Sequence, residues 1–205
     1  MPKKFPQIKF DQDPIAYIAP SWEEMNELTY ELSTQVIKHQ RSFDRIVTLA
    51  KGGWSMARPL IDYTQIPKVA SIGVKFYAGL NERCKKPQIY QNIPVSTKGE
   101  NILLFDDVAD SGESLTFTKQ HLLDKGAKTV TTATIFYKPH SKIKPDFFAS
   151  QTSAWVIFPH EVFEMIKLIG NKWKEQGLTK TEVRQRFKQF GFSSKILGGG
   201  MKLLE

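Results

Sequence analysis

Residues 102–115, ILLFDDVADSGESL, contain the features that decide the fold. Residues 102–105 are four successive apolar residues and predict a buried strand. Two adjacent carboxylates, Asp106 and Asp107, follow where that strand should end, and residues 110–114 then lead into a helix. Open α/β sheets bind ligands beyond the carboxyl ends of their strands, so we expect a site at this junction.

Strand and helix patterns alternate through the rest of the chain. We expect strands at residues 43–50, 69–77, 101–105, 129–137 and 154–158. We expect helices at residues 22–39, 54–64 and 115–124, the first of them starting with a Ser-x-x-Glu capping box. This alternation predicts an α/β fold in which helices flank a parallel sheet.

The C-terminal segment is predicted to be helical. We therefore divide the chain into a main domain, residues 1–161, and a helical extension, residues 162–205. Two amphipathic helices are expected in the extension, and Gly198–Gly200 is expected to be a flexible tail. Our interpretation is that the extension packs on the core or on a second subunit and contributes to a homodimer contact. A helix-turn-helix that reads DNA is the alternative.

Residues 78–100 contain glycines and prolines but no sustained apolar period. Loops of this length inside a compact domain are most often lids over a site. We expect a mobile active-site lid, and a small β-hairpin at its base is the alternative.

Composition limits the classes of protein to consider. The chain has 205 residues, of which 40% are hydrophobic and 24% are charged, the balance of a globular protein. No apolar run is long enough for a membrane span and no secretory signal is visible, so we expect a cytoplasmic location. The single cysteine excludes an intrachain disulfide and a multi-cysteine zinc site.

The formal net charge of +8 is concentrated near the C-terminus. Residues 162–205 hold nine Lys or Arg and four Asp or Glu, which leaves 20 basic and 17 acidic residues in the remainder. The charge of the main domain is therefore weak evidence for nucleic-acid binding, since polyphosphate ligands also favour basic proteins.

The residues after the two carboxylates suit an anion. Gly112 permits a tight turn, while Ser111, Ser114 and the amides at the start of a helix can surround a phosphate. Because Asp106 and Asp107 would repel a bare phosphate, the ligand should also carry hydroxyl groups or a metal ion. The alternative is a simple helix cap with Asp110 at the N-cap position.

The segment Leu103–Leu115 resembles the phosphoribosyl pyrophosphate signature of the type I phosphoribosyltransferase family, two acidic residues followed by Asp-Thr/Ser-Gly-x-Thr/Ser. The resemblance implies that Asp106 and Asp107 hold the ribose hydroxyls. It also implies that the loop holds the 5′-phosphate through the following residues: Asp110, Ser111, Gly112, Glu113 and Ser114.

A second segment, Lys51-Gly52-Gly53, follows the first expected strand. It resembles the pyrophosphate loop of the same family, in which a basic residue precedes two glycines and a peptide bond is often cis. Glycines let the backbone approach an anion closely, and Lys51 adds positive charge. An ordinary turn is the alternative for this segment alone.

The residues near the end of the main domain are similar to the base-binding region of xanthine-guanine and hypoxanthine phosphoribosyltransferases. The resemblance implies that Lys138 donates to a purine 6-oxygen, that Trp155 stacks on the base, and that Val156 offers backbone groups. Trp155 as a core residue is the alternative. Relatives usually have Trp where this chain has His160.

The resemblance implies purine salvage by transfer of ribose 5-phosphate from phosphoribosyl pyrophosphate to a 6-oxopurine. Asp110 is the expected catalytic residue, and Mg²⁺ is the expected cofactor, with Asp107 as its protein ligand. Adenine as the acceptor is one alternative, and a nucleotide-sensing regulator that binds nucleic acid is another. We expect no membrane partner and consider nucleic acid the weaker interpretation.

Overall fold

The computed structural model describes residues 4–40, 42–77 and 86–204 and divides the chain into two compact units. The sheet unit comprises Met1–Lys4 and Met25–Ser153, and the helical unit comprises Phe5–Glu24 and Ala154–Glu205. The helical unit thus includes residues 5–24 and 154–161 in addition to the extension expected from residue 162.

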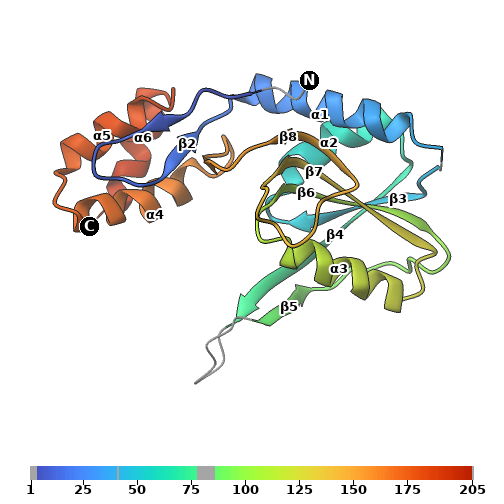
Figure 1. Cartoon of the computed structure of the whole chain (residues 1–205). Coiled ribbons are helices and arrows are strands. Elements are labelled where there is room, and N and C mark those ends of the chain that lie inside the picture. Colours follow the sequence, from blue (N-terminus) through green and yellow to red (C-terminus); the bar gives the residue numbers. More distant parts are fainter. Residues whose placement is uncertain (1–3, 41, 78–85, 205) are drawn as a thin grey trace. The chain divides into compact units, whose positions relative to one another are not determined.

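A six-stranded sheet forms the centre of the sheet unit, with strand order β5-β4-β3-β6-β7-β8 (Figure 1). All neighbouring pairs are parallel except β4 and β5, which are antiparallel. The strands are β3 (Arg45–Ala50), β4 (Lys68–Tyr77), β5 (Lys86–Gln91), β6 (Asn101–Ala109), β7 (Thr129–Tyr137) and β8 (Phe147–Gln151). The predicted α/β class with a mostly parallel sheet is confirmed.

Helices cover both faces of this sheet. Figure 1 shows α3 (Glu113–Asp124) on one face and α1 (Trp22–Ile37) with α2 (Trp54–Thr64) on the other. Leu115 and Leu122 of α3 belong to a buried cluster with Val47, Ile102 and Leu104 of the central strands. Strands that are buried on both faces need near-continuous apolar runs, which is why β3 and β6 could be recognised in the sequence.

Strand β6 is longer than the sequence analysis predicted. The expected strand ended at Phe105, whereas β6 continues to Ala109 because its pairing with β7 extends to Ala109 opposite Tyr137. Asp106 and Asp107 are therefore the last part of the strand itself and do not follow it.

The long segment after β4 contains a β-hairpin. Strand β5 pairs antiparallel with β4, with Val74 opposite Ile89, so the hairpin alternative is confirmed for this part. The tip of the expected lid, residues 78–85, lies outside the described residues.

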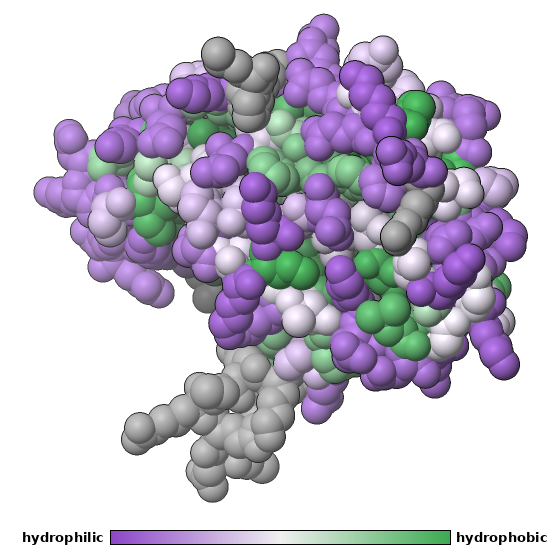
Figure 2. Space-filling view, turned by 45° about the vertical axis from the view of Figure 1, so that its right-hand side comes forward, coloured by the Kyte–Doolittle hydropathy of each residue, from purple (hydrophilic) through white to green (hydrophobic). Residues whose placement is uncertain are grey.

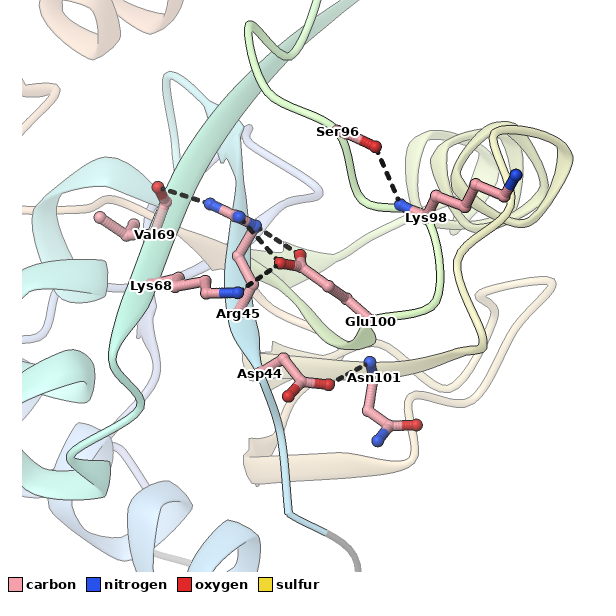
Figure 3. Close-up of polar contacts among 8 residues, drawn as sticks. All are labelled: Asp44, Arg45, Lys68, Val69, Ser96, Lys98, Glu100 and Asn101. Atoms are coloured by element: carbon pink, nitrogen blue, oxygen red, sulfur yellow. Dashed lines mark hydrogen bonds and ion pairs between the residues drawn. The ribbon is translucent and has the colours of Figure 1, made fainter.

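A buried ion pair joins β3 to the residue before β6. Arg45 donates to Glu100 twice, from Nε to Oε2 at 2.7 Å and from Nη2 to Oε1 at 3.0 Å, and Lys68 Nζ lies 2.9 Å from Oε1 (Figure 3). Hydrogen bonds from Arg45 lower the pKa of Glu100 to about 2, although partial burial opposes the shift. Asp44 Oδ2 also accepts from the Asn101 amide, so side chains fix the entry to both strands.

We expect Glu100→Gln to reduce the free energy of unfolding of the sheet unit at pH 7 by about 3 kcal/mol, because it leaves Arg45 with a neutral partner. Because folding lowers the pKa of Glu100 from 4.5 to about 2, the ionised carboxylate stabilises the fold fully at pH values above 4.5. This stabilisation is lost as the pH falls from 4.5 towards 2. Urea unfolding at several pH values should show this loss in the wild type and not in the variant. Lys68→Ala is the matched control: its side chain is 53% exposed, so we expect a change below about 1 kcal/mol. Equal effects of the two changes would contradict the prediction.

The helical unit has its own small sheet and its own core. Strands β1 (Ile8–Lys9), β2 (Ala16–Ile18) and β9 (Trp155–Val156) form the sheet, in the order β1-β2-β9. Helices α4 (Val162–Glu175), α5 (Lys180–Lys188) and α6 (Ser194–Gly200) and the short 3-10 helix η1 (Met201–Leu203) follow. One buried cluster joins Tyr17 and Ile157 to residues of all these helices, including Trp173 and Phe187. The apolar faces of α4 and α5 are thus covered within the unit.

The predicted capping box at the start of α1 is present. The Ser21 amide donates to Glu24 Oε2 at 2.8 Å, and the Glu24 amide donates to Ser21 Oγ at 3.1 Å. Thr179 and Glu182 exchange the same two hydrogen bonds at the start of α5.

The predicted flexible tail at Gly198–Gly200 is wrong, since these residues form the end of α6. A Cβ on Gly200 would lie 2.4 Å from Ile166 Cδ1, and a Cβ on Gly199 would lie 2.9 Å from Phe163 Cζ. The glycines therefore allow α6 to approach α4 closely, which composition alone did not reveal.

None of the helices in the described ranges has the length and apolar character that a bilayer span requires. On the face shown in Figure 2, apolar side chains form small separate areas among hydrophilic ones. That face offers no single large apolar patch.

Candidate functional site

The loops after β3 and β6 meet at one edge of the sheet. These strands are parallel neighbours, with Thr48 opposite Phe105, so their carboxyl ends lie side by side. A Cβ built on Gly52 would lie 2.6 Å from Asp107 Oδ2, which brings the Lys51-Gly52-Gly53 segment against the acidic pair. The peptide bond between Ala50 and Lys51 is cis, as the resemblance implied.

The acidic pair is largely withdrawn from solvent. Asp107 is buried, Asp106 is half-buried, and the Asp107 amide donates to Asp106 Oδ1 at 3.0 Å. Burial and then the neighbouring charge of Asp107 raise the pKa of Asp106, against the opposing effect of backbone hydrogen bonds from Asp107 and Gly53. Two carboxylates in this setting are stabilised by a ligand that supplies hydroxyl donors or positive charge.

The segment 110–114 forms the predicted turn into a helix. Gly112, which has no side chain, is the N-cap of α3 with φ of +78°. The alternative in which Asp110 caps the helix is therefore wrong. The Glu113 amide donates to Ser111 Oγ at 3.3 Å, and the start of α3 presents its amides beside the two serines. This arrangement suits an anion with several oxygens.

Asp110 instead contacts two basic side chains through one oxygen. His140 Nε2 lies 2.8 Å from Oδ1, and Lys138 Nζ lies 3.5 Å from the same atom. Lys138 is buried, and its amide donates to the Ala109 carbonyl at 3.0 Å, which ties the end of β7 to the end of β6. The structure thus brings Lys138 and Asp110 together, two residues 28 positions apart in the chain.

Sequence reasoning missed the segment after Lys138. Besides the contact of His140, the Lys142 amide donates to the Ser111 carbonyl at 2.9 Å, and the Lys142 side chain pairs with Glu113. A Cβ on Gly112 would lie 2.5 Å from Ser141 Oγ. The adjacency of the loops after β6 and β7 was the available signal, because consecutive parallel strands end at the same edge.

The two remaining residues of the predicted base site belong to the helical unit. Trp155 and Val156 form β9, where Val156 is buried and Trp155 packs against the hydrophobic cluster of that unit. His160 stacks on Phe158, with ring centroids 5.2 Å apart and an interplanar angle of 19°, and Trp22 lies 6.1 Å from it.

Within the described ranges, three or more acidic, histidine or cysteine side chains do not gather into a metal site. The pair Asp106 and Asp107 supplies hard oxygen donors, however. Mg²⁺ commonly takes one or two carboxylates and completes its shell with water and substrate phosphates. The residues present therefore fit a magnesium ion that arrives with a phosphorylated ligand.

Comparison with known proteins gives the class. The profile of the family described as "Phosphoribosyl transferase domain" matches residues 20–164, which is most of the chain. The chain belongs to this family and is a phosphoribosyltransferase.

Individual relatives agree with this assignment. The chain is 26% identical over 144 residues to the xanthine-guanine phosphoribosyltransferase of Idiomarina loihiensis, covering 69% of this chain and 85% of that protein. The structure of purine phosphoribosyltransferase from Pyrococcus horikoshii matches with a TM-score of 0.64 and 26% identity, covering 70% and 92% of the two chains. The Helicobacter pylori xanthine-guanine-hypoxanthine phosphoribosyltransferase matches with a TM-score of 0.60 and 25% identity, covering 76% and 99%.

Proposed function

We propose that this phosphoribosyltransferase transfers ribose 5-phosphate from phosphoribosyl pyrophosphate to a 6-oxopurine, and so acts in purine salvage. The proximity of Lys138 Nζ to Asp110 Oδ1, 3.5 Å, carries the proposal. A 6-oxopurine presents N7 and the 6-oxygen side by side on one edge. Lys138 can donate to the oxygen, and Asp110 can accept a proton or hydrogen bond from N7.

The remaining residues of the site bind different parts of the sugar phosphate. Asp106 and Asp107 bind the ribose hydroxyls, residues 110–114 bind the 5′-phosphate, and residues 51–53 bind the pyrophosphate. The adjacency of the two loops and the burial of the acidic pair support this assignment, and the raised pKa of Asp106 favours a ligand with hydroxyl donors.

Catalysis in this proposal consists of stabilising charge at both ends of the breaking bond. The ribosyl group becomes cationic as pyrophosphate leaves, and the carboxylates of Asp106 and Asp107 lie on its side. Lys51 and the backbone amides of the glycine loop stabilise the leaving group. Mg²⁺, held by Asp107 and substrate oxygens, would neutralise pyrophosphate charge.

Trp155 and Val156 stay predicted base-binding residues, by stacking and through backbone groups, on the resemblance alone. Adenine is the alternative acceptor. It carries an amino group at position 6, which is a hydrogen-bond donor. Lys138 is also only a donor, so the two groups cannot pair. A hydrogen-bonding site commonly rejects an analogue that leaves its polar groups unpaired.

A panel of acceptors tests the proposal. Protein, Mg²⁺ and phosphoribosyl pyrophosphate are mixed with hypoxanthine, guanine, xanthine, adenine or uracil, and nucleoside monophosphate is measured. We expect product with one or more of the 6-oxopurines. An enzyme that accepts only adenine would overturn the substrate class. The absence of product with every base would overturn the activity.

We expect Lys138→Ala to reduce kcat/KM for hypoxanthine by about a hundredfold or more, because the 6-oxygen loses its donor in a desolvated site. The KM for phosphoribosyl pyrophosphate should change little. Lys119→Ala, a lysine on α3 that lies near Asp146, is the matched control. An equal loss for hypoxanthine and adenine would contradict the assignment of Lys138 to the 6-oxygen.

The homodimer stays a prediction. Since the apolar faces of α4 and α5 are covered within the helical unit, a contact made by the extension would have to use its exposed side chains, Phe163, Leu168 and Ile196 among them. Sedimentation of the full chain measures the oligomeric state directly.

A further inference from the structure

His140 contacts the proposed acid-base residue but has no part in the roles assigned so far. Its Nε2 atom lies 2.8 Å from Asp110 Oδ1, the atom that Lys138 approaches to 3.5 Å. Among the described residues, both of these contacts fall on Oδ1 and no hydrogen bond is made to Oδ2. The carboxylate is thus held by one oxygen, which leaves the other available for the base.

The loop that carries His140 is fixed to the phosphate-binding turn. The Ser141 amide donates to the Lys138 carbonyl at 2.9 Å, and the Lys142 amide donates to the Ser111 carbonyl at 2.9 Å. The Lys142 side chain pairs with Glu113 at the start of α3. These backbone contacts lie on either side of His140, so the histidine is presented to Asp110 from a defined position although its side chain is 61% exposed.

In the proposed function, the ammonium group of Lys138 has two partners, Asp110 and the purine 6-oxygen. In the free site it lies beside Asp110, but a donor to the purine 6-oxygen has to direct its hydrogens towards the base. Asp110 then loses part of its interaction with Lys138 during proton transfer. Its orientation matters most at that step, because acid-base catalysis depends on hydrogen-bond geometry to the reacting atom. His140 can supply that hold, since its Nε2–H donates whether the ring is neutral in that tautomer or protonated.

We infer that His140 is a positioning residue for Asp110: it keeps Oδ1 in place while Lys138 turns to the base, so that Oδ2 faces N7. This inference rests on the proposed function. His140 contacts neither the sugar nor the base in this scheme and acts only through Asp110.

The test compares His140→Ala, His140→Gln and the wild type. We expect His140→Ala to lower kcat by about ten- to a hundredfold, the scale for misplacing a catalytic group by an ångström or less, with little change in the KM for phosphoribosyl pyrophosphate. Exposed pairs contribute little to folding, so the unfolding midpoint should be unchanged. His140→Gln places an amide donor near the position of Nε2 and should restore most of the lost kcat. His121→Gln, at the end of α3, is the control for the residue change.

A double variant separates positioning from other effects. If His140 acts only through Asp110, then adding His140→Ala to Asp110→Asn should lower kcat no further. A wild-type chain that is inactive with every base overturns the proposed function and this role with it. An unchanged kcat in His140→Ala, or additive losses in the double variant, overturns the role of His140 alone.

Discussion

Asp110→Asn should lower kcat by about two to four orders of magnitude, the usual effect of losing a general acid-base group, and leave the KM for phosphoribosyl pyrophosphate nearly unchanged. Asparagine has the shape of aspartate but cannot take up a proton. The Asp110 side chain is 53% exposed at the open edge of the sheet, in contact with His140 and Lys138, so it is accessible to a bound base. Steady-state kinetics with both substrates varied would measure the effect.

The substitution should not disturb the fold. Gly112, and not Asp110, is the N-cap of α3, so the helix loses no cap when the carboxylate is replaced. Asp124→Asn, at the other end of the same helix, changes a carboxylate that accepts from Gln120 and serves as the matched control. Turnover close to the wild-type value in Asp110→Asn would remove this residue from the mechanism.

Local sequence patterns predicted the central sheet because its strands carry their own signal. Residues 102–105 and 45–50 are nearly continuous apolar runs, as a strand covered on both faces requires. The order of the acidic pair, the Gly112 turn and the following helix also lies within one short segment. Functional residues that lie close together in the sequence can therefore be predicted without knowledge of tertiary contacts.

Features that depend on pairing between distant segments were mispredicted or missed. Strand β6 runs to Ala109 only because β7 pairs with it that far, and no apolar residue at position 106 or 107 signals this. His140 and Lys142 were not predicted as part of the site, because their partners Asp110 and Glu113 are 30 and 29 residues away. Sequence spacing alone cannot show which loops share the edge of a sheet.

The helical unit shows the same limit. Its expected helices are present, but the contribution of residues 5–24 was not foreseen, since Phe10, Asp13 and Tyr17 lie more than 140 residues from the helices that they contact. The buried carboxylate of Asp13 accepts from Tyr17 Oη and Trp173 Nε1, each at 2.6 Å. Burial alone would raise the pKa of Asp13, but these hydrogen bonds outweigh it and the pKa is lowered.

We expect Trp173→Ala to destabilise the helical unit by about 3–5 kcal/mol, the usual cost of removing a fully buried large aromatic residue. The indole is completely buried and packs edge-on against Phe10 and Tyr17, with centroid distances of 5.2 and 5.9 Å. Truncation also removes a donor from the buried Asp13 carboxylate, which adds to the cost of the cavity.

Trp173→Phe separates the two contributions. It retains most of the apolar area but not the N–H group, so we expect a loss of about 1–3 kcal/mol, the cost of an unsatisfied buried acceptor. Because the chain has two units, hydrogen exchange of the α4 and α5 amides measures the effect better than a single global unfolding transition. Trp22→Ala is the control within the same unit: its side chain is 53% exposed, and we expect a change of about 0.5 kcal/mol or less. If protection of α4 and α5 survived Trp173→Ala as well as it survives Trp22→Ala, the cluster around Asp13 would not be what holds residues 5–24 to the C-terminal helices.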